Sequence, residues 1–280
     1  MVDDRGLIFL HVPKTAGSTL RPIIDRHYAA EVICKLDVLP RDLEMFLGLP
    51  EQTRSKIRVL EGHLQFGLHE HLSVPVDYVT MLRDPVDRII SMYYWILGNQ
   101  KHILNSVVKS MSLADFAGSG FEITANHQTR LISGLMQNFS ADALSVAKNN
   151  LTSHITAFGL SEKFDESLIL FKSLLGWKRV FYVRRNVTKN RPRRDEPPDS
   201  TIQVIKNHNA LDMELYEFAR NRFDEIISKR GQSFQDEVAG FRRLNKIYSK
   251  FTMGKNIVRR ALPPPARAAI KKGLRAFRSS

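Results

Sequence analysis

The sequence predicts an α/β fold in which a central parallel sheet is flanked by helices. Three segments, residues 7–10, 76–82 and 157–160, are short and mostly apolar, as expected of strands that are buried in a parallel sheet. Each of them is followed by a stretch in which apolar residues recur at helical spacing. This alternation indicates parallel strands that are joined by crossover helices.

The remaining segments extend the same alternation along the chain. Residues 41–46 have the amphipathic spacing of a helix, and residues 165–175 add an apolar stripe that suits a core. Residues 96–125 are less patterned, and the glycines within 118–120 indicate a flexible turn. The other elements that we expect are strands at 31–34, 58–60 and 179–183, a helix at 141–151, and one or two helices over 202–227.

Length and composition fit a globular protein with one main α/β domain. The chain has 280 residues, of which 43% are hydrophobic and 25% charged. Its single cysteine, Cys34, excludes an internal disulfide bond and favours a reducing compartment. No signal peptide is visible, and no apolar run approaches the length of a membrane span. We therefore expect a cytoplasmic location.

The positive charge is concentrated at the end of the chain. The net charge is +13, but residues 246–280 contain ten Lys and Arg and no acidic residue. Because the rest of the chain is close to balanced, the net charge gives no argument for nucleic-acid binding. We expect a main domain at 1–233 and a basic extension at 234–280. This extension is either a disordered solubilising tail or an amphipathic segment that contacts anionic lipid at the inner membrane.

The first candidate site lies between the strand at 7–10 and the helix that begins near Ser18. The intervening loop, in HVPKTAGSTL, consists of small residues together with one cation, Lys14, and several hydroxyls. Backbone N–H groups and the positive end of a helix dipole converge at such a turn, so it can hold a phosphate. It is not a Walker A loop, because the lysine precedes the glycine. The alternative is an ordinary turn with a surface lysine.

The second candidate site follows the strand at 76–82. Arg83 ends this strand, Asp84 and Pro85 begin a helix, and Ser91 lies eight residues beyond the arginine. The carboxyl edge of a parallel sheet is where such folds bind ligands, and an arginine offers a planar fork for phosphate oxygens. Arg83 and Ser91 are therefore placed to contact one phosphate.

Together the two motifs resemble those of a known family. HVPKTAGSTL is similar to the 5′-phosphosulfate loop, and LRDPVDRIISMYYW to the 3′-phosphate motif, of carbohydrate sulfotransferases that use 3′-phosphoadenosine 5′-phosphosulfate (PAPS). The form is similar to heparan sulfate 2-O-sulfotransferases and their bacterial relatives. The resemblance covers about residues 7–225, and the order and spacing of the two motifs are its specific part.

The resemblance implies a P-loop-kinase-like sulfotransferase fold and a PAPS-dependent enzyme. Such an enzyme transfers a sulfuryl group to a hydroxyl of a carbohydrate or glycolipid. Golgi members of the family carry an N-terminal membrane anchor, which this sequence does not show, so we expect a bacterial, cytoplasmic member. The oligomeric state is not indicated by the sequence.

The cofactor-binding residues follow from the same resemblance. Lys14 is also expected to be catalytic, because its charge can neutralise the leaving phosphate. A basic loop after residues 179–183 contributes two weaker candidates, Lys189 and Arg191, for which a solvated basic turn is the alternative. The residues implied to bind PAPS are Lys14, Thr15, Ala16, Gly17, Ser18, Thr19, Arg83, Ser91, Lys189 and Arg191.

The catalytic base is expected directly after the strand at 58–60. His63 is the first candidate, because a neutral imidazole can take the proton of an acceptor hydroxyl. Glu61 is the rival, because other glycan sulfotransferases use a glutamate and residues two apart along a strand point the same way. The 2-O-sulfotransferases have a histidine at the position of Glu61, and this sequence departs from them there. His63 can also be a hydrogen-bonded core histidine. We expect no metal site, because the histidines at 63, 69 and 71 lack a ligand pattern of known spacing.

Two other functional classes stay open at this point. A nucleotide-dependent phosphotransferase on a related fold is disfavoured by the missing Walker A motif and the lack of an evident magnesium carboxylate. A catalytically inactive glycan-binding relative is disfavoured by the presence of Lys14, Arg83, Ser91 and His63.

Overall fold

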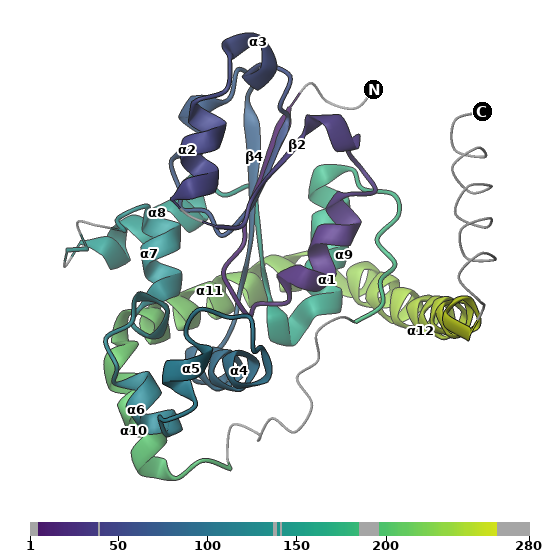
Figure 1. Ribbon diagram of the computed structural model, residues 1–280. Helices are drawn as coiled ribbons and strands as arrows, with labels where there is room; N and C mark the ends of the chain where they lie inside the picture. Colours follow the sequence, from purple (N-terminus) through teal and green to yellow (C-terminus); the bar gives the residue numbers. More distant parts are fainter. Residues whose placement is uncertain (1–4, 39, 137–138, 141, 185–195, 262–280) are drawn as a thin grey trace.

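The computed structural model describes residues 5–38, 40–136, 139–140, 142–184 and 196–261, with side chains up to residue 252. These residues contain one sheet of five parallel strands in the order β2-β3-β1-β4-β5. Figure 1 shows the sheet at the centre with helices around it. The strands are β1 (Gly6–Leu10), β2 (Ile33–Leu36), β3 (Val59–Gly62), β4 (Val76–Leu82) and β5 (Ala157–Leu160).

The register of the sheet brings three chain segments to one edge. β1 is the central strand, and Leu10 at its end pairs with Gly62 of β3 and with Thr80 of β4. The residues that follow these strands therefore emerge together at the carboxyl edge. This is the edge at which open parallel sheets bind ligands.

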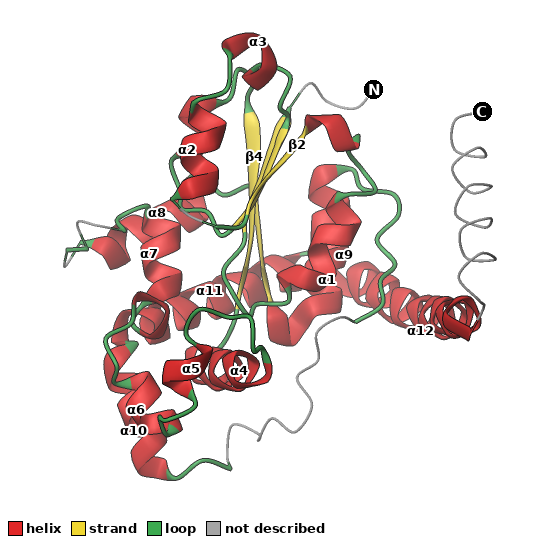
Figure 2. Cartoon of the chain, in the orientation of Figure 1, coloured by secondary structure: helices red, strands yellow, loops and turns green. Residues whose placement is uncertain are grey.

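Helices cover both faces of the sheet, as Figure 2 shows, with α1 and α9 on one side and α2 and α8 on the other. The fold class predicted from the sequence is confirmed. The helices are α1 (Gly17–Ile24), α2 (Arg41–Leu47), α3 (Glu51–Arg54), α4 (Pro85–Gly98), α5 (Asn105–Val108), α6 (Leu113–Ala117), α7 (His127–Ser133), α8 (Ala143–Ser153), α9 (Phe164–Leu175), α10 (Asp199–His208), α11 (Ala210–Lys229) and α12 (Gly231–Ala261).

Two hydrophobic cores hold these layers together. The main core contains residues of all five strands and reaches α9 and α11. In β1 the residues from Leu7 to Leu10 are fully buried. A smaller core joins α4 to α5, α6 and α10 through residues such as Ile89, Phe116 and Ile205. The less patterned segment 96–125 is therefore packed against α4, next to the carboxyl edge of the sheet.

The prediction of a strand at 179–183 is wrong. The structure assigns no strand there, because the backbone of this segment bonds to side chains of α12 instead of to the sheet. The Tyr182 N–H donates to Asn245 Oδ1 at 2.8 Å, and Ser249 Oγ donates to the Tyr182 carbonyl at 2.9 Å. Phe181 also stacks on Phe241, with ring centroids 5.6 Å apart.

Helix α12 crosses the boundary that we expected between residues 233 and 234. Phe234, Val238 and Phe241 are buried in the main core, so the first part of the expected extension packs on the domain. The division into 1–233 and 234–280 stays a prediction for the residues further along. No helix in the described part of the chain is long and apolar enough to span a membrane.

Candidate active site

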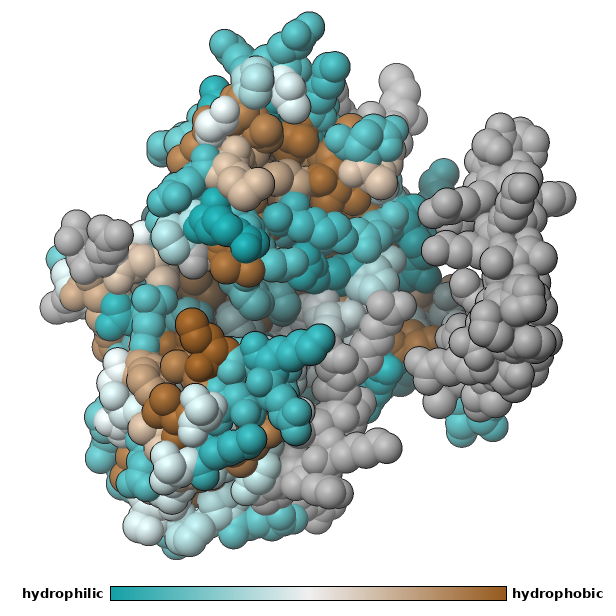
Figure 3. Space-filling view, in the orientation of Figure 1, coloured by the Kyte–Doolittle hydropathy of each residue, from teal (hydrophilic) through white to brown (hydrophobic). Residues whose placement is uncertain are grey.

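A cavity of about 580 Å³ opens at the carboxyl edge of the sheet. Its size suits a nucleotide or a ligand of similar size. Figure 3 shows a hydrophilic band between apolar surface over α2 and apolar surface near α5. Of the residues predicted from the sequence, the cavity is lined by Lys14, Ala16, Gly17, Ser18, Thr19, His63, Arg83 and Ser91.

The loop between β1 and α1 has an unusual backbone conformation. Lys14 (φ 71°) and Ala16 (φ 68°) both occupy the left-handed region, which costs a residue with a side chain about 1–3 kcal/mol. Helix α1 begins directly afterwards at Gly17, and the first N–H groups of a helix have no partner within it. The helix dipole adds partial positive charge at the same point. The loop therefore has the construction of a phosphate-binding turn.

Two buried contacts fix the shape of this loop. A Cβ added at Gly17 would lie 2.0 Å from Nε2 of His11, so only glycine fits beside that ring. The Thr15 side chain is fully buried, and its Oγ1 donates to the Val12 carbonyl at 2.7 Å. Thr15 does not line the cavity. This corrects the expectation that its hydroxyl faces a ligand: the hydroxyl is used inside the loop.

Arg83 links the second motif to the first. Its Nη1 donates to the Lys14 carbonyl oxygen at 3.0 Å, and its side chain lines the cavity. Ser91 lies on the face of α4 that borders the cavity, together with Asp87 one turn earlier. Helix α4 is capped at Asp84, which accepts from the Asp87 N–H at 3.1 Å. The cap sets the direction in which α4 leaves the strand end.

Gln128 holds the backbone of Arg83 from both sides. Its Oε1 accepts from the Arg83 N–H at 3.1 Å, and its Nε2 donates to the Arg83 carbonyl at 2.9 Å. Asp212 on α11 holds Gln128 in turn, by accepting from the Gln128 N–H at 3.1 Å and the Thr129 N–H at 2.7 Å. The side chains of Gln128, Thr129 and Asp212 are all fully buried. The position of Arg83 is therefore set by α7 and α11 as well as by its own strand.

His63 lines the cavity and follows β3. Its ring centroid is 5.0 Å from that of His11. Burial lowers the pKa of His63, while the Asp37 carboxylate and a hydrogen bond to the Asp37 backbone oppose the shift. The neutral imidazole keeps a ring nitrogen with a free lone pair, which can accept a proton.

Burial also lowers the pKa of His11 well below its ordinary value, with His63 as the next cause. His11 is therefore neutral near pH 7 and does not add charge beside Lys14. Lys14, Arg83 and Arg184 are the cations that the described residues contribute to the cavity lining.

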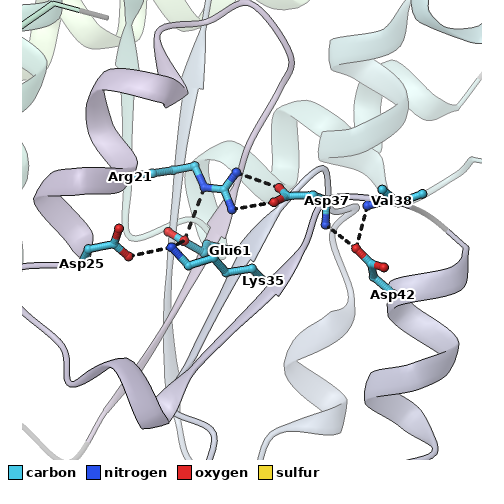
Figure 4. A network of polar contacts seen from close by, with 7 residues as sticks. All are labelled: Arg21, Asp25, Lys35, Asp37, Val38, Asp42 and Glu61. Atoms are coloured by element: carbon cyan, nitrogen blue, oxygen red, sulfur yellow. Dashed lines mark hydrogen bonds and ion pairs between the residues drawn. The ribbon is translucent and has the colours of Figure 1, made fainter. Parts of the chain in front are cut away.

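Glu61, the rival candidate base, is held away from the cavity by two cations. Figure 4 shows its carboxylate beside Arg21 and Lys35, with Oε1 3.3 Å from Arg21 Nε and 2.8 Å from Lys35 Nζ. Arg21 also donates to both oxygens of Asp37, at 2.7 and 3.1 Å. Glu61 is fully buried and does not line the cavity. This geometry argues against Glu61 as the base and favours His63.

Several lining residues were not singled out from the sequence. Trp95 and His102 border the cavity beyond Ser91, and Tyr182 and Arg184 border it where the basic loop begins. Trp95 lies four residues after Ser91, a spacing that places both on one helix face, so this signal was available. The predicted residues Lys189 and Arg191 lie outside the described residues.

No group of three His, Cys, Asp or Glu side chains in the described part of the chain is arranged to hold a metal ion. Glu162, which lines the cavity, accepts from the Asp84 N–H at 3.1 Å and from the Tyr216 hydroxyl at 3.0 Å. Burial raises the pKa of Glu162. This acid therefore anchors the start of α4 rather than standing as a ligand.

Comparisons with known proteins place the chain among sulfotransferases. A family model described as galactose-3-O-sulfotransferase matches residues 3–263. Galactose-3-O-sulfotransferase 3 of Mus musculus is 26% identical over 253 residues, covering 81% of this chain and 58% of the relative. Heparan-sulfate 6-O-sulfotransferase 3 of Mus musculus is 25% identical over 281 residues, covering 78% of this chain and 57% of the relative. The chain thus spans less than two thirds of these curated relatives.

Among solved structures, mouse sulfotransferase SULT7A1 complexed with PAP matches with a TM-score of 0.37 and 15% identity, over 76% of this chain and 66% of that one. The carbohydrate sulfotransferase resemblance expected from the sequence is confirmed at the level of the family. Its finer part, the similarity to 2-O-sulfotransferases, stays a prediction, because the relatives named here are of galactose-3-O and heparan-sulfate 6-O type.

Proposed function

Since the chain belongs to the galactose-3-O-sulfotransferase family, we propose that it transfers a sulfuryl group from PAPS to a hydroxyl of a carbohydrate or glycolipid. One observation carries this proposal. The loop at Lys14 and the strand end at Arg83 face one cavity and are joined by a hydrogen bond of 3.0 Å. Two anion sites at a fixed separation suit a nucleotide that carries phosphates at both its 5′ and its 3′ positions.

The residues of the cavity fit PAPS by their chemistry. The 5′-phosphosulfate suits one end of the cavity, which is formed by Lys14, Ser18, Thr19 and the first N–H groups of α1. Arg83 and Ser91 form the site that suits the 3′-phosphate. Tyr182 and Arg184 line the cavity at the start of the basic loop that we expect at the nucleotide end. PAPS, when bound, supplies the activated sulfuryl group.

The protein's own groups divide the remaining work. Lys14 places a positive charge where negative charge develops on the leaving phosphate, an effect that commonly contributes about 10²–10³-fold in rate. His63, which lines the cavity, accepts the proton of the attacking hydroxyl on a ring nitrogen. The burial of His63 keeps the ring neutral and ready to accept a proton at pH 7.

The acceptor is proposed from the relatives. They are named for galactose and for heparan sulfate, so a sugar hydroxyl is the acceptor class that we propose for this chain. An inactive glycan-binding relative would need neither Lys14 nor His63 at the cavity wall, whereas both are there.

Calorimetry with 3′-phosphoadenosine 5′-phosphate (PAP), 5′-AMP and ATP, all without metal ions, tests the cofactor. We expect PAP to bind at least about tenfold more tightly than 5′-AMP, because only PAP offers a phosphate to Arg83 and Ser91. In a parallel titration with magnesium added, tighter binding of ATP than of PAP would replace the sulfotransferase proposal with a phosphotransferase. Transfer of sulfate from PAPS to a mixture of glycans separates an active enzyme from an inactive relative.

We also propose a cytoplasmic location with peripheral contact to anionic membrane through α12. Leu244, Ile247 and Phe251 are 56%, 66% and 63% exposed on one face of this helix, and no acidic residue follows Glu237. Apolar residues beside cations suit an anionic lipid surface. Sedimentation with phosphatidylserine vesicles, compared with pure phosphatidylcholine vesicles, tests this contact. The exposed cations beside the apolar residues are Arg243, Lys246 and Lys250.

A further inference from the structure

We propose that Trp95 and His102 form the acceptor subsite, an aromatic platform on which an uncharged sugar ring stacks with one hydroxyl directed toward His63. This inference rests on the proposed sulfotransferase function and adds the site and the class of the acceptor. Both residues line the same cavity as Lys14 and His63. The two rings contact each other edge to face, with centroids 5.0 Å apart.

The position of Trp95 along α4 places it at the reacting end of the cavity. Asp87, Ser91 and Trp95 line the cavity at intervals of four residues, which is a step of about 6 Å along a helix. Ser91 therefore meets the proposed 3′-phosphate, and the indole lies one turn further on. The Lys14 Nζ lies 4.9 Å from the centroid of the Trp95 ring.

The contact with Lys14 distinguishes an acceptor platform from an adenine platform. Lys14 is the residue that we place at the transferred group, so the ring beneath its ammonium lies at that end of the nucleotide. The base of the nucleotide belongs at the other end, where Tyr182 and Arg184 lead into the basic loop. Once Lys14 turns toward the phosphosulfate, the face of the indole becomes available to the acceptor.

The chemistry of this wall suits an uncharged ring. Met92 and Ile123 line the cavity beside Trp95, and neither they nor His102 brings a charge. His102 Nδ1 accepts from the Leu104 N–H at 3.2 Å, so the ring proton is on Nε2. Burial also lowers the pKa of His102.

A pyranose ring has a face of C–H groups, which packs on an aromatic face, and hydroxyls on its edge, which can accept from His102 Nε2–H. Among the described residues, the cations that line the cavity are Lys14, Arg83 and Arg184, and we assign all three to the nucleotide. Once PAPS occupies them, the described part of this wall offers no further cation to a carboxylated or sulfated sugar. The wall therefore favours a neutral hexose over an acidic sugar at the reacting position.

The sequence offers a direct probe, because Trp95 and Trp177 are its two tryptophans. Trp177 is buried against His27 and Phe171, away from the cavity. In Trp177→Phe, fluorescence reports Trp95 alone. We expect methyl β-galactoside, methyl β-glucoside or lactose to change the emission of the PAP-saturated protein saturably. An anionic heparin oligosaccharide should have no such effect.

Kinetics of Trp95→Ala complete the test, with Trp177→Phe as the matched control. We expect the KM for the neutral acceptor to rise about tenfold in Trp95→Ala, which corresponds to one lost stacking contact, and to recover largely in Trp95→Phe. The affinity for PAP should change less than about twofold, since the indole does not contact the nucleotide in this proposal.

Three outcomes would overturn the subsite. Loss of PAP affinity in Trp95→Ala with an unchanged acceptor KM would assign the indole to adenine. An emission change with the heparin oligosaccharide alone would assign the wall to acidic sugars, and no change with any of the sugars would leave the indole without a role in binding the acceptor. Failure of the wild-type chain to bind PAP is a separate result, which removes the proposed function itself.

Discussion

Arg83 Nη1 donates a hydrogen bond to the carbonyl oxygen of Lys14, 3.0 Å away. The two residues are 69 positions apart in the sequence, and we assign them to two different proposed anion sites. This bond makes the arginine part of the phosphate loop as well as part of the strand end. We therefore expect a change at Arg83 to affect the phosphate loop as well as the proposed 3′-phosphate site.

The first prediction follows from this bond. Arg83→Ala should weaken PAP binding by about 10–100-fold, because it removes a charged donor to the phosphate and the support of the Lys14 carbonyl. It should also weaken the binding of 5′-AMP, which has no 3′-phosphate, because the loop loses its support. Ser91→Ala is the matched control, since it should weaken the binding of PAP but not that of 5′-AMP. Calorimetry with both nucleotides measures this, and unchanged 5′-AMP affinity in Arg83→Ala would show that the bond to Lys14 does not support the loop.

Gln128 provides a second prediction, because it clamps the backbone of Arg83 without lining the cavity. Gln128→Ala should lower the free energy of unfolding by about 1–3 kcal/mol, since it leaves buried backbone groups unpaired. PAP binding should fall in the same variant, while the kcat with saturating PAPS should be nearly retained. Urea denaturation and a KM-against-kcat comparison measure the two effects. A loss of stability with an unchanged KM for PAPS would limit Gln128 to a structural role.

Lys14 is predicted to act on turnover. Lys14→Ala should lower kcat by about 10²–10³-fold, because the positive charge near the leaving phosphate is lost. PAP binding should fall less, since the loop N–H groups and Arg83 remain. Single-turnover rates with PAPS measure the chemical step directly. Normal turnover in this variant would contradict the catalytic role that we propose for Lys14.

The pH dependence of the rate tests His63. The neutral ring is the active form, and burial lowers its pKa below the ordinary value of 6.5. Activity should therefore be constant above pH 6.5 and decline only as pH falls through the lowered pKa, when the ring becomes protonated. His63→Ala should reduce kcat by about 10²–10⁴-fold and abolish this acid limb. A variant that keeps the acid limb would assign it to another group, with His11 as the nearest alternative.

The sequence predicted most of the framework because the relevant signals are local. The strands at 76–82 and 157–160 agree with the structure to the residue, since a short, mostly apolar segment followed by a helical pattern is typical of a strand in a parallel sheet. The cavity brings together Lys14 and Arg83 because Lys14 follows β1, Arg83 follows β4, and these two strands pair with each other. Short spacing and strand order were sufficient for that step.

Contacts between distant segments account for what the sequence did not show. The expected strand at 179–183 is absent because Asn245 bonds to its backbone from a helix more than sixty residues away. The choice between His63 and Glu61 depends on Arg21, which lies forty residues earlier and faces the carboxylate only after folding. Trp95 was different: its spacing from Ser91 was visible, but nothing local showed that Lys14 lies over its ring.

The last prediction concerns Glu61, whose carboxylate we place in a structural network and not in catalysis. Glu61→Gln keeps the shape of the side chain but removes the charge that faces Arg21 and Lys35. Breaking a buried ion pair leaves uncompensated charge, so the free energy of unfolding should fall by about 2–4 kcal/mol. Arg21 keeps its two bonds to Asp37, which limits the loss.

The same variant separates the two candidate bases. If His63 is the base, Glu61→Gln should retain kcat within a few-fold and keep the acid limb of the pH profile, measured at a temperature at which the variant is folded. Asp37→Asn is the matched control, because it weakens the other partner of Arg21 and leaves Glu61 in place. A loss of kcat of a hundredfold or more in Glu61→Gln, with normal kcat in Asp37→Asn, would transfer the role of base to the carboxylate.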